Sequence, residues 1–249
     1  MKQSELIYGI HAVHTVLNTR PKDVLRLFIQ SNRQDKKINE IKLLATKHNI
    51  VCEEISTQEF HKLVNEDARH QGVVVKTRLM ATWTENTLME SIKNNEQRIV
   101  ILILDGVQDP HNLGACLRSA NAFGVHAVIA PKDRAASLTD VVRKVACGAA
   151  EHTPFVAVTN LHRTLQQLQE MGIWFVGFDS EATQRLDQID LKGNIGIVMG
   201  NEGSGLRRLT REKCDFLAQI PMFGMVESLN VSVATGIALY ETQRQRLAK

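Results

Sequence analysis

The segment IVILILDGVQDPHNLGACLRSANAFG, residues 99–124, decides the fold of this chain. Its first six residues, 99–104, are aliphatic without interruption and predict a strand that is buried on both faces. The residues that follow predict a helix over about 112–123, with Gly124 as its C-terminal cap. A short apolar strand that leads into a helix is typical of a parallel sheet covered by helices.

The same alternation continues along the rest of the chain. Further strands are predicted at 126–130, 155–158, 173–178, 195–199 and 216–220, and helices at 139–147, 161–170, 206–213 and 229–246. Because every strand is short and apolar and most are followed by a helix, residues 98–249 are expected to form an α/β domain with a parallel sheet.

A smaller α/β domain is predicted ahead of it. Short apolar strands alternate with helically spaced apolar residues over residues 1–77, a normal length for a compact domain. Residues 78–97 are polar and lack a sustained apolar pattern, so we expect them to form a linker. One helix signal lies within this stretch, a capping box of Thr87 and Glu90.

The basic residues are concentrated in the first third of the chain. The net charge is +3, and residues 1–80 carry 13 Lys and Arg against 9 Asp and Glu, whereas residues 99–249 carry 15 of each. This distribution favours an N-terminal module that faces a polyanion, although an ordinary soluble surface explains it about as well. The aromatic content of 5% disfavours an RNA-binding sheet that stacks bases on aromatic rings.

The cysteines and the N-terminal residues predict a cytoplasmic protein. Four cysteines lie far apart without a CxxC pair, namely Cys52, Cys116, Cys147 and Cys214. This spacing disfavours a disulfide framework or zinc ribbon and favours a reducing compartment. Polar residues interrupt any apolar N-terminal region, and the longest aliphatic run is too short for a bilayer, so neither a signal peptide nor a membrane partner is expected.

Polar loops follow three of the predicted strands. These loops are DGVQDPHN after strand 99–104, GNEGSGLRR after strand 195–199, and PMFGMVESLN after strand 216–220. In open parallel sheets, ligands bind outside the carboxyl ends of the strands. We therefore expect these loops to build one small-molecule site.

The glycines of the second loop indicate close approach of the backbone to a ligand. Gly200, Gly203 and Gly205 form GxxGxG, which differs from the dinucleotide fingerprint GxGxxG. A P-loop would need Lys followed by Ser or Thr where this chain has Leu206 and Arg207, so a phosphate cradle is not favoured. A simple turn would need one glycine rather than three.

Several polar side chains in the three loops, and one in the helix predicted after the first loop, are candidates for chemistry. Asn112 is suited to cap the predicted helix, and Arg118, six residues later among apolar neighbours, either reaches the surface or binds an anion. Glu202 alone would be a solvated charge, but Ser228 and Asn230 in the third loop suggest a shared site.

A metal site is the weaker interpretation of this region. Asp105, Asp109 and His111 could serve as ligands or in acid–base chemistry, but no second cluster of ligating residues occurs elsewhere in the sequence. We therefore expect no metal.

These segments resemble a known family, the SpoU (TrmH-like) RNA ribose methyltransferases. The stretches DPHNLGACLRSANAFG, IVMGNEGSGLRR and IPMFGMVESLNVSVATGIALYE look like its motifs one, two and three. IYGIHAV, HQG, PKDRAA and KVACGAAE extend the resemblance over nearly the full chain. The resemblance implies a C-terminal SPOUT domain with a deep trefoil knot, an N-terminal L30e-like domain that binds RNA, and a homodimer. Knots are otherwise rare in proteins.

The resemblance also implies a reaction. A methyl group would pass from S-adenosylmethionine to the ribose 2′-hydroxyl of a guanosine in the peptidyl-transferase P-loop of 23S rRNA. The implied catalytic residues are Asn112, Arg118, Glu202 and Asn230, and the implied cofactor-binding residues are Gly200, Ile220, Met222, Ser228 and Leu229. We expect Arg118 to bind phosphate and stabilise the developing oxyanion rather than act as a base, because an ordinary guanidinium does not give up its proton.

Three alternative functions make different demands on the sequence. A nucleotide-dependent oxidoreductase would need GxGxxG directly after strand 99–104, and this is absent. A catalytically silent RNA-binding protein is disfavoured because all four polar catalytic candidates are present. The same methyl transfer on tRNA, or at another rRNA site, stays open as an alternative.

Overall fold

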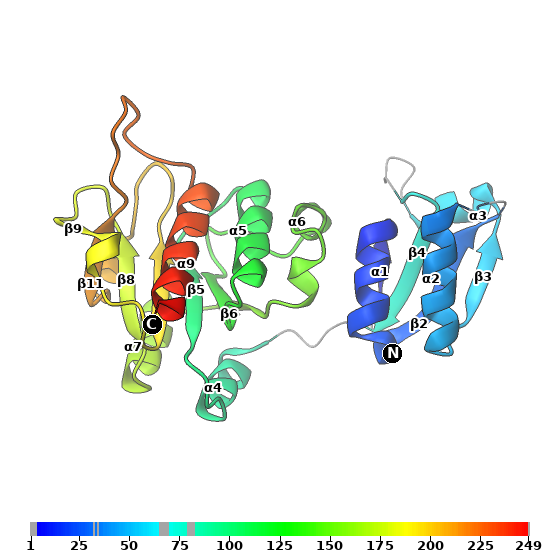
Figure 1. Cartoon of the computed structure of the whole chain (residues 1–249), viewed down its shortest axis with the longest axis horizontal. Coiled ribbons are helices and arrows are strands. Elements are labelled where there is room, and N and C mark those ends of the chain that lie inside the picture. Colours follow the sequence, from blue (N-terminus) through cyan, green and yellow to red (C-terminus); the bar gives the residue numbers. More distant parts are fainter. Residues whose placement is uncertain (1–3, 32, 34, 65–69, 79–82, 249) are drawn as a thin grey trace. The chain divides into compact units, whose positions relative to one another are not determined.

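The computed structural model describes residues 4–31, 33, 35–64, 70–78 and 83–248. The chain divides into two compact units, Met1–Ala81 and Thr82–Lys249 (Figure 1).

The first unit is built on a mixed four-stranded sheet with the strand order β1-β4-β2-β3. Its strands are β1 (Ser4–Tyr8), β2 (Val24–Gln30), β3 (Cys52–Ile55) and β4 (Val73–Arg78), and its helices are α1 (Ile10–Thr19), α2 (Lys36–Lys47) and α3 (Thr57–Leu63). Strand β4 runs antiparallel to β1 and β2, and β3 runs parallel to β2.

Alternating side chains of β2 build two small cores on the two faces of this sheet. Leu27 and Ile29 pack with the apolar faces of α1 and α2, whereas Phe28 packs with Phe60 of α3 on the other side. Strand β1 is not among the elements predicted from the sequence. It lies at the edge of the sheet and buries only Ile7, so it carries no apolar alternation that would mark it.

The second unit contains a seven-stranded sheet in the order β7-β6-β5-β10-β8-β11-β9, in which every neighbouring pair is parallel. The strands are β5 (Val100–Leu104), β6 (Ala127–Pro131), β7 (Phe155–Val158), β8 (Trp174–Phe178), β9 (Gln184–Arg185), β10 (Ile195–Met199) and β11 (Phe216–Gln219). The prediction of an α/β domain with a parallel sheet is therefore confirmed. Only the two-residue β9 was not predicted.

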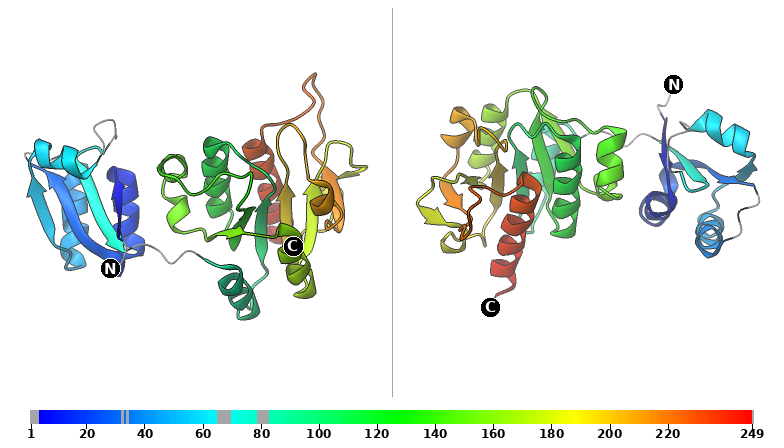
Figure 2. Two further views of the ribbon diagram at one scale, coloured as in Figure 1. Left: turned by 180° about the vertical axis from the view of Figure 1, so that it is seen from behind. Right: turned by 90° about the horizontal axis from the view of Figure 1, so that it is seen from above.

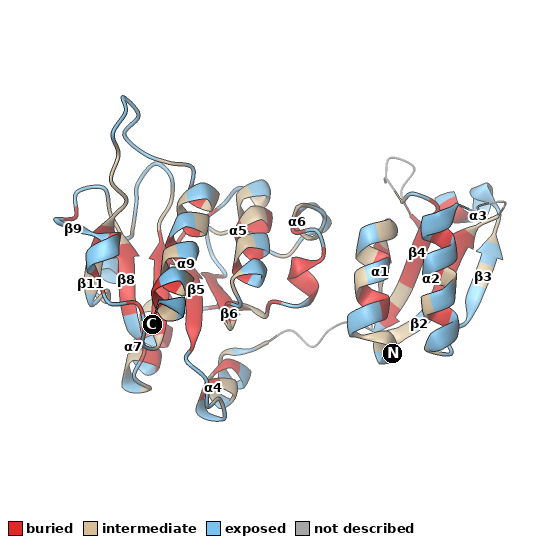
Figure 3. Cartoon of the chain, viewed as in Figure 1, coloured by how far each residue is buried: buried red, intermediate tan, exposed pale blue. Residues whose placement is uncertain are grey.

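Helices cover both faces of this sheet. They are α4 (Glu85–Lys93), α5 (Pro110–Ala122), α6 (Asp140–Val145), α7 (Leu161–Glu170), α8 (Arg208–Arg211) and α9 (Val231–Leu247). Leu102 and Leu104 of β5 face the core shared with α5 and α9, whereas Ile101 and Ile103 face the core shared with α4 and α7. Because β5 has a core on each side, all of its residues are buried and its sequence is a continuous apolar run (Figure 3).

Helices α5 and α9 lie side by side on one face of the sheet (Figures 1 and 2). Gly114 of α5 allows α6 to approach closely, since a Cβ at this position would lie 2.6 Å from the Cβ of Val145 and 2.9 Å from the carbonyl oxygen of Val142. One face of α5 thus packs on α9 and another on α6.

The prediction that residues 78–97 form a linker is wrong over most of this stretch. Residues 83–97 include helix α4, whose Leu88 and Ile92 enter the core of the second unit. The capping box is formed by Thr84 and Thr87, one turn earlier than predicted, with the Thr84 side chain accepting from the Thr87 nitrogen at 3.2 Å. Residues 79–82 lie outside the described part of the chain. Within that part, no helix is both long and apolar enough to cross a membrane.

Candidate functional site

The site lies where the strand order of the large sheet reverses. Strands β5, β6 and β7 follow one another towards one edge, and β10 lies on the other side of β5. The loops after β5 and β10 therefore leave the sheet next to each other, at the type of position where open parallel sheets bind ligands.

A single carboxylate joins the three predicted loops. Oε1 of Glu202 accepts hydrogen bonds from Nδ2 of Asn112 at 2.9 Å and from Nδ2 of Asn230 at 2.6 Å. It also accepts from the backbone nitrogen of Val231 at 3.3 Å, and Nδ2 of Asn230 donates to Oδ1 of Asn112 at 2.9 Å. We call Asn112, Glu202 and Asn230 the polar cluster. Its members come from the first turn of α5, the loop after β10 and the N-cap of α9.

The glycine-rich loop holds Glu202 at its tip. Asn201 and Gly205 exchange backbone hydrogen bonds of 3.0 and 2.9 Å, and Nδ2 of Asn201 donates to the carbonyl of Gly106 at 2.9 Å. A Cβ on Gly200 would collide with the backbone of Gly205. At Gly200, the close approach predicted from the glycines is therefore a contact between two parts of the same loop. The resulting tight turn presents Glu202 to the other two loops.

Asn112 does not cap helix α5 as predicted. The cap is Asp109, whose Oδ1 accepts from the backbone nitrogen of His111 at 3.1 Å. Pro110 takes the first helical position, where its missing N–H costs no hydrogen bond. Asn112 is thus the third residue of the helix, and its amide is available for Glu202.

The two ends of the Asn230 amide have partners with opposite requirements. Its Oδ1 accepts from the backbone nitrogen of Ser232 at 3.0 Å and so caps helix α9, while its Nδ2 donates to Glu202 and Asn112. Because the two ends of the amide have different partners, the orientation of this side chain is fixed.

Arg118 lies apart from the polar cluster. It lies six residues after Asn112, which places it about 240° around the axis of α5 and about 9 Å along it. The side chain is exposed, and its Nη1 donates to Sγ of Cys147 at 3.9 Å. The helix that carries both residues therefore directs them to different surfaces.

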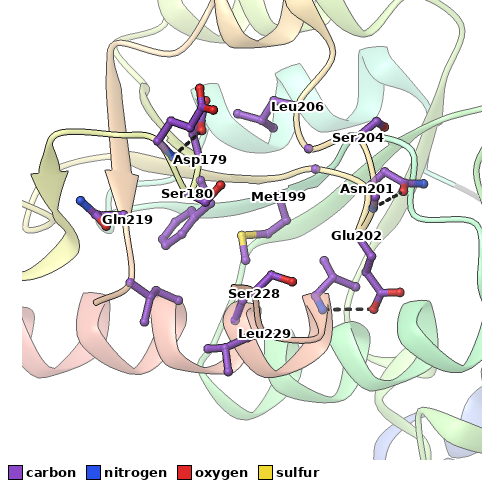
Figure 4. Close-up of a pocket in the computed structure, with 18 of the residues that line it drawn as sticks. Asp179, Ser180, Met199, Asn201, Glu202, Ser204, Leu206, Gln219, Ser228 and Leu229 are labelled. Atoms are coloured by element: carbon purple, nitrogen blue, oxygen red, sulfur yellow. Dashed lines mark hydrogen bonds between the residues drawn. The ribbon is translucent and has the colours of Figure 1, made fainter. Parts of the chain in front are cut away.

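A cavity of about 770 Å³ lies beside the polar cluster (Figure 4). All five residues predicted to bind the cofactor line it, namely Gly200, Ile220, Met222, Ser228 and Leu229. Glu202 lines it as well, whereas Asn112, Arg118 and Asn230 do not. The volume falls within the range of small-molecule sites, and the lining combines apolar side chains with the exposed backbone of two loops.

The end of strand β8 supplies part of the cavity that was not predicted. Phe178, Asp179, Ser180 and Glu181 line it, and Oδ2 of Asp179 accepts from Nε of Arg211 at 2.8 Å. The polar residues after strand 173–178 are the signal that could have found them. Because β8 lies between β10 and β11, its carboxyl end has to face the same cavity.

Two thiols of this unit, the buried Cys116 and the half-buried Cys214, are not suited to covalent chemistry. Burial raises the pKa of Cys116 to about 11 and that of Cys214 to about 12. Both stay protonated at neutral pH, and a protonated thiol is a poor nucleophile.

The acidic residues considered as metal ligands have other partners. Asp105 accepts from the backbone nitrogen of Arg207 at 3.0 Å, and Asp109 caps α5. Among the described residues, no group of three or more His, Cys, Asp or Glu side chains could hold a metal ion.

Comparison with known proteins gives matches to both units. The family model described as SpoU rRNA Methylase matches residues 99–240, and the model described as RNA 2'-O ribose methyltransferase substrate binding matches residues 6–81. The 23S rRNA (guanosine-2'-O-)-methyltransferase RlmB of Coxiella burnetii is 55% identical, covering 100% of this chain and 98% of its own. The protein of the same name from Escherichia coli K12 is 49% identical, covering 98% and 99%.

Solved structures share the fold. The SpoU methyltransferase AviRb from Streptomyces viridochromogenes, in complex with the cofactor AdoMet, superposes with a TM-score of 0.79 at 24% identity, covering 98% of this chain and 91% of its own. The TrmH/SpoU tRNA modifying enzyme of A. aeolicus is 30% identical with a TM-score of 0.56, covering 65% and 82%.

Proposed function

The chain belongs to the SpoU rRNA Methylase family, and on that premise we propose that it methylates the ribose 2′-hydroxyl of a guanosine in 23S rRNA, with S-adenosylmethionine as the methyl donor. Relatives named for this reaction align with it over almost their whole length at about half identity. The observation that carries the proposal is the polar cluster, because Glu202 joins all three loops beside a cavity of suitable size.

S-adenosylmethionine fits the cavity lined by Gly200, Ile220, Met222, Ser228 and Leu229. The volume suits a nucleoside with an amino-acid arm, and the apolar side chains among the lining residues suit a base. When bound, the cofactor supplies a methyl group that a nucleophilic oxygen can accept. The loops around the cavity would hold the cofactor, exclude water and direct it towards the polar cluster.

The polar cluster would order the acceptor. Oε1 of Glu202 is occupied by three donors, and its Oε2 has no hydrogen-bond partner among the described residues. We assign Oε2 to accept a hydrogen bond from the ribose 2′-hydroxyl, with Asn112 and Asn230 holding the carboxylate in place. Alignment of this kind accounts for a large part of the rate of a bimolecular transfer.

Arg118 would contact the RNA rather than the polar cluster. Its exposed guanidinium suits a phosphate, which it can bind through paired donors. Stabilisation of the 2′-oxygen, expected from the resemblance, is not assigned to it, because α5 directs Arg118 and Asn112 to different surfaces.

The assembly is proposed to be a homodimer formed through α9. One face of α9 carries three exposed apolar residues at helical spacing, namely Val233, Ile237 and Tyr240, which are 50%, 38% and 57% exposed. These side chains are therefore not part of the core of their own unit. The opposite face of α9, with Ala238 and Leu239, is the buried one. An exposed apolar face of this kind suits a self-complementary contact with a second copy.

The finer features of the family belong to the same proposal. They are a trefoil knot in the SPOUT domain, an L30e-like fold for the first unit, the P-loop of 23S rRNA as the target, and a cytoplasmic location. The family match over residues 99–240 supports the knot, and the substrate-binding match over residues 6–81 supports RNA binding by the first unit.

A methylation assay tests the proposed function. Purified protein is incubated with tritiated S-adenosylmethionine and transcripts of 23S rRNA or of tRNA, and the modified nucleotide is mapped. Label at one guanosine ribose of the P-loop is expected. Label on tRNA alone would overturn the substrate and favour the activity for which the A. aeolicus relative is named.

A further inference from the structure

Arg207 lies on the side of the glycine-rich loop that faces away from the cofactor cavity. Its neighbours Leu206 and Arg208 line the cavity, but Arg207 does not. It contacts the end of strand β5 instead, where its backbone nitrogen donates to Oδ2 of Asp105 at 3.0 Å and its Nε lies 3.5 Å from Oδ1 of the same carboxylate.

The burial of Asp105 at the end of strand β5 is energetically unfavourable. The residue is 1% exposed, and its Oδ1 has no hydrogen-bond partner in the described part of the chain. Burying a carboxylate with so few partners is unfavourable for folding. An asparagine would accept the same hydrogen bond from the Arg207 backbone without a buried charge. The charge therefore acts on the guanidinium, which it attracts and orients.

Gly106 leaves space for that guanidinium. Its φ of +89° is a left-handed conformation, and a Cβ there would lie 3.4 Å from Nη2 and 3.8 Å from Nε of Arg207. The Arg207 side chain is 43% exposed, and neither Nη atom has a hydrogen-bond partner among the described residues. Two oriented donors thus face solvent between the loop that leads to Asn112 and the loop that carries Glu202.

We propose that Arg207, oriented by Asp105, binds a backbone phosphate of the RNA next to the target ribose. The fork of a guanidinium matches the oxygens of a phosphate, and an arginine that is already held in place loses less entropy on binding. The carboxylate of the cofactor is the other anion at this site, but Arg207 is not among the residues that line the cofactor cavity. The inference rests on the proposed function, since it takes RNA as the substrate.

The salt dependence of RNA binding tests this. The affinity for a 23S rRNA fragment is measured against potassium chloride concentration for wild type, Arg207→Ala, Arg207→Lys and Asp105→Asn. Arg207→Ala is expected to bind the RNA roughly tenfold more weakly at low salt. The slope of log affinity against log salt concentration should become shallower by about 0.7 to 0.9, which is the contribution of one phosphate contact. Arg207→Lys should keep most of the slope while losing affinity, because it keeps the charge but not the fork.

Asp105→Asn should weaken RNA binding although it keeps the acceptor for the Arg207 backbone. Cofactor affinity, measured by calorimetry, should stay near wild type in all three variants. Arg185→Ala is the matched control, since Arg185 is an exposed arginine paired with Asp187 at 3.0 Å in the same unit, and it should change neither quantity.

Two results would overturn the inference while leaving the proposed function intact. One is an Arg207→Ala enzyme with unchanged RNA affinity and salt slope. The other is a loss of cofactor affinity as large as the loss of RNA affinity, which would mean that the pair only holds the loop. A wild-type protein that methylates no RNA would instead overturn the proposed function, and the inference with it.

Discussion

The amide nitrogen of Asn230 donates a hydrogen bond of 2.6 Å to the carboxylate of Glu202, while the amide oxygen of the same residue caps helix α9. One side chain therefore contributes both to the stability of a helix and to the order of the site. The two contributions can be separated by substitution.

Asn230→Ser should separate them. Serine is a good N-cap residue, so the free energy of unfolding should stay within a few tenths of a kcal/mol of wild type. It lacks the amide donor to Glu202, and turnover should fall at least tenfold. Asn230→Ala should lose the same turnover and in addition about 1 kcal/mol of stability. Urea unfolding and the methylation assay measure the two effects, and equal stability of the two variants would contradict the capping role.

Glu202→Gln should reduce turnover by roughly tenfold or more. A neutral amide accepts weaker hydrogen bonds than a carboxylate, so Asn112 and Asn230 would be held less firmly. Cofactor affinity should change much less, because the variant keeps the size of the side chain. Glu170→Gln, at an exposed position near the end of α7, is the control and should leave kcat unchanged. Wild-type turnover in Glu202→Gln would show that the reaction does not depend on the carboxylate of Glu202.

Arg118→Ala should abolish turnover and leave the binding of S-adenosylmethionine near normal. The residue does not line the cofactor cavity and lies apart from the polar cluster. Arg118→Lys keeps the charge but not the paired donors and should retain part of the activity. Calorimetry that shows lost cofactor affinity in Arg118→Ala would contradict its assignment to the RNA.

Gly114→Ala should destabilise the second unit by about 1 to 3 kcal/mol, the usual cost of overpacking. The added methyl would press on the Val145 side chain and the Val142 backbone, and the backbone cannot turn away as a flexible side chain can. Gly193→Ala meets no atom within 4 Å and serves as the control. Thermal unfolding measures both, and equal midpoints would show that α6 shifts freely away from α5.

Stability should fall in alkaline solution because of the buried thiols. The pKa of Cys116 is raised by burial from 9.0 to about 11, so the folded state favours the protonated thiol. The resulting stabilisation is fully present below about pH 8.5 and is lost as the pH rises towards about 11. Urea midpoints should therefore drop across this window, and the drop should be smaller in Cys116→Ala. An equal drop in both proteins would show that the thiol does not contribute.

The apolar core was the part of the fold that could be predicted from the sequence. Strand 99–104 is buried on both faces, so its side chains had to be apolar throughout, and the same holds for β10. Strand β1 escaped prediction because an edge strand that buries one side chain has no such pattern. Helix α4 was not recognised as part of the domain because its buried face is limited to Leu88 and Ile92 within a polar stretch.

The place of the site was predictable, but its internal connections were not. Strand ends in a parallel sheet converge by geometry, which brought Asn112, Glu202 and Asn230 together as expected. Which residue caps α5 depends on where Pro110 starts the helix, and a shift of three residues changed Asn112 from a cap to a partner of Glu202. The hydrogen-bond partners of a side chain follow from such small offsets.

The pairing of β5 with β10 has a consequence for how the protein folds. Val100 lies opposite Ile195 in the sheet, so a long intervening segment must close before the two central strands can meet. Non-local parallel pairing of this kind slows folding, since the entropy of closure is lost before the contacts form. The helices can form early, but Asn112 and Glu202 meet only when β5 and β10 have paired, because one follows β5 at the start of α5 and the other lies in the loop after β10. Activity should therefore return last during refolding, well after the recovery of helical circular dichroism.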